Sequence, residues 1–96
     1  MDIYALLQQK KTDILRISQQ HGAYNVRVFG SVVRGNATEN SDIDFLVSME
    51  KGRSLLDMGG LLMDLQKLLG HKVDLVTEHG LHWYIKEQVL KEARPI

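Results

Sequence analysis

The 96-residue sequence contains no cysteine and a single proline, Pro95. The lack of cysteine excludes disulfide bonds and thiolate metal ligands. Twelve Lys and Arg residues balance twelve Asp and Glu residues, so the formal net charge is zero and no broad polyanion-binding surface is expected. The sequence also lacks an apolar run of membrane-spanning length and a basic, then apolar, N-terminal leader. We therefore expect a soluble cytoplasmic protein without membrane or direct nucleic-acid contacts.

The composition is that of an ordinary globular protein, with 44% hydrophobic and 25% charged residues. A chain this short buries only about two-thirds of its unfolded surface, so its core is thin. No internal repeat or low-complexity linker divides the sequence. Residues 1–96 are therefore expected to form one domain.

Hydrophobic periodicity predicts helices and strands in the order α, β, short α, β, α, β, α. Asp2 and Ser54 are expected to cap helices, and glycines follow two of the helical segments. The expected segments are a helix at 3–21, a strand at 24–29, a helical turn at 31–34, a strand at 42–49, a helix at 54–69, a strand at 72–77 and a helix at 81–94.

The connections between these segments predict the topology. The first two strands are joined by a loop with one helical turn and are expected to be antiparallel, whereas a full helix joins the second and third in a parallel, right-handed crossover. The fold class is therefore α/β (α+β), a small mixed sheet with flanking helices. The pair Gly59-Gly60 is unusual inside a helix, and predicts either a later helix start or the close approach of another backbone.

Two aspartates one residue apart, Asp42 and Asp44, open the second strand, and Gly30-Ser31 lies at the end of the first strand. Antiparallel pairing of the two strands would bring these features together at one edge of the sheet. Because side chains alternate along a strand, both carboxylates point to one face and Ile43 points to the core. Asp74, near the start of the parallel third strand, adds a third carboxylate. Carboxylates this close raise one another's pKa values. Mg²⁺ prefers oxygen ligands, and its positive charge would compensate the negative charge of these carboxylates.

The Gly30-Ser31 turn predicts a phosphate site beside these carboxylates. Glycine lets the backbone approach an anion closely, and a short helix beginning at Ser31 directs N–H groups toward it. Arg34, one turn further, is placed to donate to a phosphate. An isolated Asp-x-Asp is common at solvated strand ends, but the combination indicates a site for a metal-bound nucleoside triphosphate, with two metal ions roughly 3.5–4 Å apart.

These motifs resemble those of a known family. Gly30-Ser31, ten intervening residues and Asp42-Ile43-Asp44 resemble the signature of the DNA polymerase β-like nucleotidyltransferase superfamily. Arg34-Gly35 and the segment 41–47 resemble its minimal nucleotidyltransferase (MNT) branch, and the segment 72–76 resembles the strand that carries the third carboxylate. The similarity covers nearly the whole chain, including Glu92-Ala93-Arg94-Pro95 at its end.

The resemblance implies a polymerase β palm-like core and a role for each motif residue. Gly30 and Ser31 hold the triphosphate, with Arg34 as an additional phosphate contact. Asp42 and Asp44 bind two Mg²⁺ ions, while Asp74 binds the catalytic ion and helps to activate the attacking hydroxyl.

The resemblance also implies a partner. MNT proteins act as antitoxins by transferring AMP from ATP to a tyrosine of a HEPN-family ribonuclease toxin, with release of pyrophosphate. This chain contains little beyond the catalytic core, so we expect an incomplete adenine pocket that the partner completes. The alternatives are a non-enzymatic antitoxin that acts by occlusion, and a transferase acting on RNA ends or on a small molecule such as an aminoglycoside.

Some residues allow two interpretations. His79 and His82 are interpreted as surface histidines rather than zinc ligands, because no cysteine is present to complete a site. Trp83 and Tyr84 are interpreted as core or edge residues rather than partner contacts.

Overall fold

The computed structural model describes residues 2–96, which form five helices and one four-stranded sheet. In chain order the elements are α1 (Ile3–Gln9), α2 (Lys11–Gln20), β1 (Ala23–Phe29), α3 (Ser31–Arg34), β2 (Ile43–Met49), α4 (Leu55–Leu69), β3 (Val73–Thr77), α5 (Trp83–Glu92) and β4 (Arg94–Pro95). No helix within residues 2–96 has both the length and the apolar character needed to cross a membrane.

The strand order in the sheet is β3-β2-β1-β4. β1 and β2 are antiparallel and β2 and β3 are parallel, which confirms both predicted pairings. β4 was not predicted, because Pro95 was expected to end the last helix. Instead, α5 ends at Glu92, and Arg94 and Pro95 pair with β1. A proline is compatible with a short edge strand, where its missing N–H interrupts no ladder.

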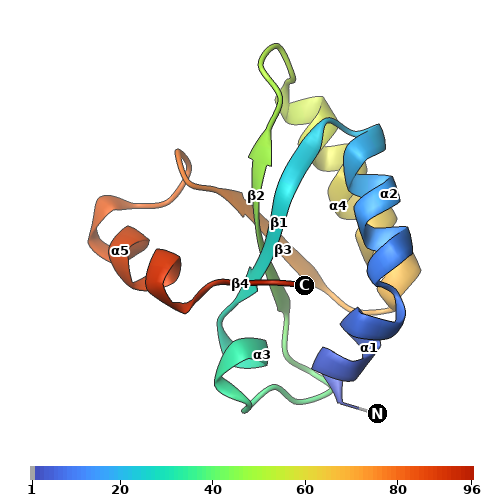
Figure 1. Cartoon of the computed structure of the whole chain (residues 1–96), viewed down its shortest axis with the longest axis vertical. Helices are drawn as coiled ribbons and strands as arrows, with labels where there is room; N and C mark the ends of the chain where they lie inside the picture. The colour runs from blue at the N-terminus through green and yellow to red at the C-terminus, as the bar shows by residue number, and fades with distance from the viewer. Residues whose placement is uncertain (1) are drawn as a thin grey trace.

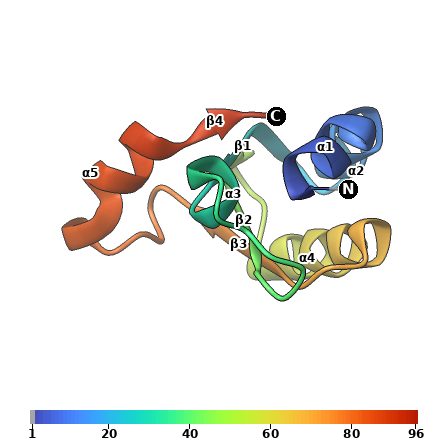
Figure 2. The ribbon, with the colours of Figure 1, turned by 90° about the horizontal axis from the view of Figure 1, so that it is seen from below.

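The hydrophobic core lies between the sheet and the helices α2 and α4, which cover one face of it (Figures 1 and 2). Ile43, Phe45 and Val47 of β2 alternate into this core and are fully buried. The intervening positions of β2, including Asp44 and Leu46, therefore point to the other face. That face lies on the side of the sheet where α5 is found (Figure 1).

The helix expected at 3–21 is divided into α1 and α2 at Lys10. No glycine or proline marks this position, so hydrophobic periodicity alone gives no sign of a boundary there. Leu7 of α1 and Ile14 of α2 are both fully buried, and the change of direction allows both helices to face the core. The division is therefore a result of tertiary packing.

The helix α4 runs through both Gly59 and Gly60, because a capping box at Ser54 and Asp57 starts it before them. A Cβ atom at Gly59 would have no neighbour within 4 Å. A Cβ atom at Gly60 would lie 2.9 Å from the imidazole of His21, which follows α2. The group that approaches this helix is thus a side chain and not another backbone.

Replacing Gly59 and Gly60 separately should distinguish the effect of helix propensity from the effect of packing against His21. Gly59→Ala is expected to raise the free energy of unfolding by about 0.5–1 kcal/mol, because alanine favours the helix. Gly60→Ala should raise the free energy of unfolding less than Gly59→Ala does, or lower it. The His21 ring must move to make room for the new Cβ, and this movement disturbs its 2.7 Å contact with Asp64. Urea unfolding followed by circular dichroism measures both, and equal stabilisation by the two substitutions would contradict the role of His21.

The helix α5 projects away from the sheet (Figures 1 and 2). Val89 is its buried residue. Trp83 and Tyr84 are 78% and 76% exposed, so the interpretation of these two aromatics as core or edge residues is wrong. His79 and His82 are exposed as expected, and the His82 side chain caps α5 by accepting from the Tyr84 N–H.

Candidate functional site

Strand register places the central carboxylate beside two other predicted site residues. Asp44 of β2 is paired with Asp74 of β3 on one side and with Phe29 of β1 on the other. Gly30 directly follows Phe29, and its Cα lies so close that an added Cβ would collide with the Asp44 carboxylate. The structure therefore brings Gly30, Asp44 and Asp74 together at one end of the sheet.

The electrostatic environment of Asp44 is unfavourable for a negative charge. Burial, then the neighbouring Asp74 and Asp42 carboxylates, raise the pKa of Asp44 to about 6, while Arg34 acts in the opposite direction. Asp42, immediately before β2, and Asp74 are both exposed. A half-buried carboxylate between two others would be stabilised by a bound cation.

This raised pKa makes a prediction for stability. The folded state binds the Asp44 proton more tightly than the unfolded state, so the free energy of unfolding should fall as pH rises from about 4 to about 6. The expected size is on the order of 1 kcal/mol, because the group is partly solvated. Asp44→Asn should remove this component. Thermal unfolding of both proteins from pH 4 to 7.5, without divalent cations, measures it, and parallel pH profiles would contradict it.

Gly30 adopts a backbone conformation that favours glycine, with φ 76° and ψ −146°. Its carbonyl accepts hydrogen bonds from the N–H groups of Val33 and Arg34, which begins the single turn of α3. Ser31 is the first residue of that turn. The Gly-Ser motif therefore folds locally as expected, as a tight turn directly after β1.

Glu92 is a site residue that the sequence did not predict. The Gly30 N–H donates to Glu92 Oε2 at 2.8 Å, and Arg34 Nη1 donates to Glu92 Oε1 at 2.7 Å. Glu92 is 62 positions from Gly30. It is the last residue of α5, where an acidic side chain is unfavourable for the helix dipole. An acidic residue in the last turn of the predicted helix was a sequence signal of another role.

A shallow cavity of about 250 Å³ lies at this end of the sheet. Gly30, Arg34 and Asp44 form one side, and Ile85, Gln88 and Glu92 of α5 are among the residues of the other. Its volume is below the range of about 300–1,000 Å³ typical of ligand pockets. The site is thus partial, with α5 as one wall.

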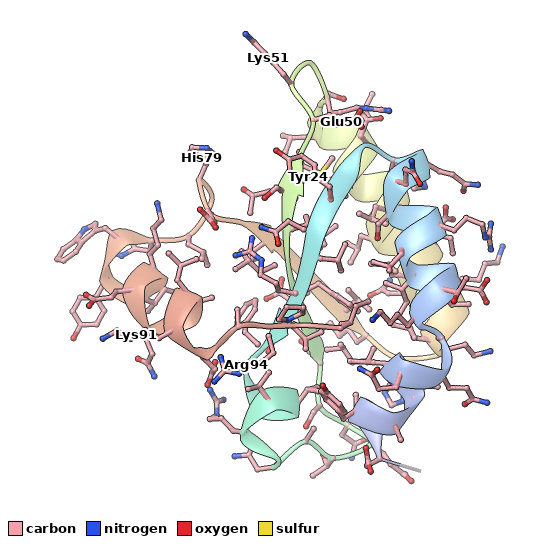
Figure 3. All side chains as sticks on the ribbon, in the orientation of Figure 1. Tyr24, Glu50, Lys51, His79, Lys91 and Arg94 are labelled. Atoms are coloured by element: carbon pink, nitrogen blue, oxygen red, sulfur yellow. The ribbon has the colours of Figure 1, made fainter. Side chains whose placement is uncertain are left out.

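A larger cavity of about 540 Å³ lies at the opposite end of the strands. Figure 3 shows two of its lining residues, Tyr24 and His79, at that end, far from α3. None of the six residues predicted for the site lines it. Cavity size therefore does not identify the chemistry of this protein.

The carboxylates fit Mg²⁺ by the chemistry of their donors. Within residues 2–96, no group of three or more His, Asp or Glu side chains is arranged to hold a metal ion by itself. Mg²⁺ is typically held by one or two carboxylates together with waters and substrate phosphates, so a complete protein cage is not required. Asp42, Asp44 and Asp74 supply suitable oxygens beside the Gly30 turn.

Comparison with known proteins gives consistent matches along the chain. The sequence model of the family described as "Nucleotidyltransferase domain" matches residues 10–96. Protein adenylyltransferase MntA of Thermococcus cleftensis is 40% identical over 92 residues, which cover 96% of this chain and 90% of that protein.

Two solved structures share the fold. One, described as a minimal nucleotidyltransferase, is 49% identical and superposes with a TM-score of 0.87, covering 100% of this chain and 97% of the other. The second is a toxin-antitoxin structure with AMP-PNP, which superposes with a TM-score of 0.74 over 88% of this chain and 70% of that chain. Its identity is 23%, so this second match is evidence of the fold alone.

Proposed function

This chain belongs to the nucleotidyltransferase domain family, and we propose that it transfers AMP from ATP to a tyrosine of a HEPN-family ribonuclease toxin, thereby acting as an antitoxin. The observation that carries the proposal is the convergence of Gly30, Asp44 and Asp74 at one end of the sheet, next to Arg34. The name of the Thermococcus relative, a protein adenylyltransferase, supports the choice of a protein acceptor.

The reaction is a displacement at the α-phosphorus of ATP. The tyrosine oxygen forms a bond to this phosphorus, the bond from the phosphorus to the bridging oxygen breaks, and pyrophosphate leaves with that electron pair. Asp74, exposed and in register with Asp44, is assigned to help remove the phenolic proton. The geometry required is an in-line approach, and catalysis rests mainly on positioning and charge stabilisation.

The remaining residues bind and orient the nucleotide. The Gly30 N–H and the Arg34 guanidinium are assigned to phosphate oxygens, with Ser31 in the same turn. Mg²⁺ held by Asp42, Asp44 and Asp74 would neutralise charge that develops on the phosphate oxygens. Each of these assignments uses a residue that borders the α3 end of the sheet.

We assign to the toxin partner the part of the nucleotide site that this chain does not form. The cavity is small and open, and α5 forms only one wall of it. A toxin subunit that covers this opening would supply both the acceptor tyrosine and the missing wall for adenine.

Transfer can be measured directly with the purified chain, Mg²⁺ and α-labelled ATP, with and without the HEPN-family toxin proposed as its partner. We expect label on the toxin by gel and a mass increase of one or more AMP groups. A stable complex that carries no label would instead support neutralisation by binding. Label on added RNA or on an aminoglycoside, but not on protein, would contradict the protein acceptor.

A further inference from the structure

The carboxylate of Glu92 already contacts both groups that we assign to the nucleotide phosphates. Its Oε2 accepts from the Gly30 N–H at 2.8 Å, and its Oε1 accepts from Arg34 Nη1 at 2.7 Å. The Glu92 side chain is only 15% exposed, whereas that of Arg34 is 53% exposed. One planar anion thus bridges a backbone donor and a guanidinium donor from separate positions of the turn.

We infer that Glu92 occupies the phosphate seat of this site in the free protein, as an internal carboxylate that a nucleotide phosphate must displace. The phosphate seat is defined here as the Gly30 N–H together with the Arg34 guanidinium. This inference rests on the function proposed above. It makes Glu92 a competitor of the nucleotide within the same chain, and gives its helix a direct connection to nucleotide binding.

The chemistry of the contact supports displacement. A carboxylate and a phosphate both accept charge-assisted hydrogen bonds, and a triphosphate offers more oxygens and more negative charge to the same donors. Glu92 also lies near the Asp44 carboxylate and ends a helix, two conditions that are unfavourable for a negative charge. The Asp44 carboxylate and the C-terminal end of α5 therefore both weaken the contact of Glu92 with the phosphate seat.

The mechanical setting also permits displacement. Glu92 belongs to α5, which projects from the sheet and whose buried residue is Val89. The following residues are held separately, by the pairing of β4 with β1 and by the buried Ile96. Figure 3 shows Arg94 at this junction, between α5 and the sheet. A rotation of the Glu92 side chain can therefore release the seat without disturbing the core under α2 and α4.

Three substitutions test the inference. Glu92→Gln removes the charge, and Glu92→Asp keeps the charge but shortens the side chain by one methylene, so that it no longer spans both donors. Glu87→Gln is the matched control, because it makes the same charge change on α5 at an 83% exposed side chain paired with Lys91. Circular dichroism melting establishes that each variant is folded.

Binding of inorganic triphosphate, and then of ATP, is measured by calorimetry on the whole chain. When the binding-competent form is only a fraction of the population, the apparent affinity is reduced by that fraction. We expect Glu92→Gln and Glu92→Asp to bind triphosphate roughly tenfold more tightly than the natural protein, and Glu87→Gln to be unchanged. The Gly30 amide resonance should also shift in the free Glu92→Asp protein, because its acceptor is lost.

Each other outcome overturns the inference in a distinct way. If only Glu92→Gln binds more tightly, net charge and not occupation of the seat is responsible. If both variants bind more weakly, Glu92 positions Arg34 for the phosphate. If the natural protein binds ATP and labels its partner but no Glu92 variant changes affinity, the inference alone fails. If no protein binds triphosphate or ATP, the proposed function fails with it.

Discussion

Asp44→Asn is expected to reduce the proposed AMP transfer by roughly 10³-fold or more while leaving the protein folded. Asparagine keeps the shape of the side chain but removes the negative charge that a Mg²⁺ ion requires. Asp44 is also the carboxylate in the centre of the site, with Asp74 beside it in register and Gly30 against it.

The same substitution should not destabilise the fold. Burial and neighbouring carboxylates raise the pKa of Asp44, so the neutral amide removes an unfavourable charge from the folded state at neutral pH. We expect an unchanged or higher free energy of unfolding above about pH 6. Loss of transfer can then be assigned to chemistry and not to unfolding.

A matched control is available on α2. Asp13→Asn makes the same chemical change at a side chain that is 46% exposed and pairs with Arg16 at 3.2 Å. Surface ion pairs of this kind are worth about 0–1 kcal/mol, so transfer should remain near that of the natural protein. Labelling of the toxin with α-labelled ATP measures both variants. Full activity in folded Asp44→Asn protein would refute the assignment of Asp44 to metal binding and catalysis.

Gly30→Ala is expected to lower transfer about 10²-fold and the free energy of unfolding by about 2–4 kcal/mol. Two effects combine at this position. The φ of 76° is strained for alanine, and the new Cβ would collide with the Asp44 carboxylate. Asp44 must then move from its place between β1 and β3, and a displacement of about 1 Å in a catalytic group costs on the order of 10²-fold in rate.

Gly52→Ala separates these two effects. Gly52 also has a positive φ, of 90°, but a Cβ there would meet nothing within 4 Å. It should cost about 1–2 kcal/mol of stability through backbone strain alone and leave transfer unchanged. Urea unfolding and labelling of the toxin measure both substitutions. Equal activity of the two variants would show that close contact between Gly30 and Asp44 is unimportant for the reaction.

The local features of this protein follow from its sequence because they depend on residues close along the chain. The helix α4 follows the N-cap Ser54 and ends at Leu69 before Gly70, as its caps predict, and the later start that Gly59-Gly60 left open is not observed. The alternation in β2 places Ile43 in the core and Asp44 on the other face. Connection lengths predict which strands pair in which direction, and these directions bring Gly30, Asp44 and Asp74 to one end of the sheet.

Side-chain exposure was predicted less well, because it depends on which other element packs against a helix. Leu55 has the helical spacing of a core residue, yet it is the first residue of α4 and is 84% exposed. Trp83 and Tyr84 are exposed for a related reason, since the helix that carries them projects from the sheet. Periodicity identifies an apolar stripe but does not specify how much of it a partner element covers.

The sequence by itself determined the acidic residues, the glycine turn and the order of the elements that carry them. Only the tertiary structure decided the contact of Glu92 with Gly30 and Arg34. Glu92 is 62 residues from Gly30 and 58 residues from Arg34 along the chain. This contact arises because β4 returns the end of the chain to the edge of β1, and so sets the end of α5 beside the Gly30 turn. No local pattern encodes such a return, because a two-residue edge strand has too few residues to show any periodicity.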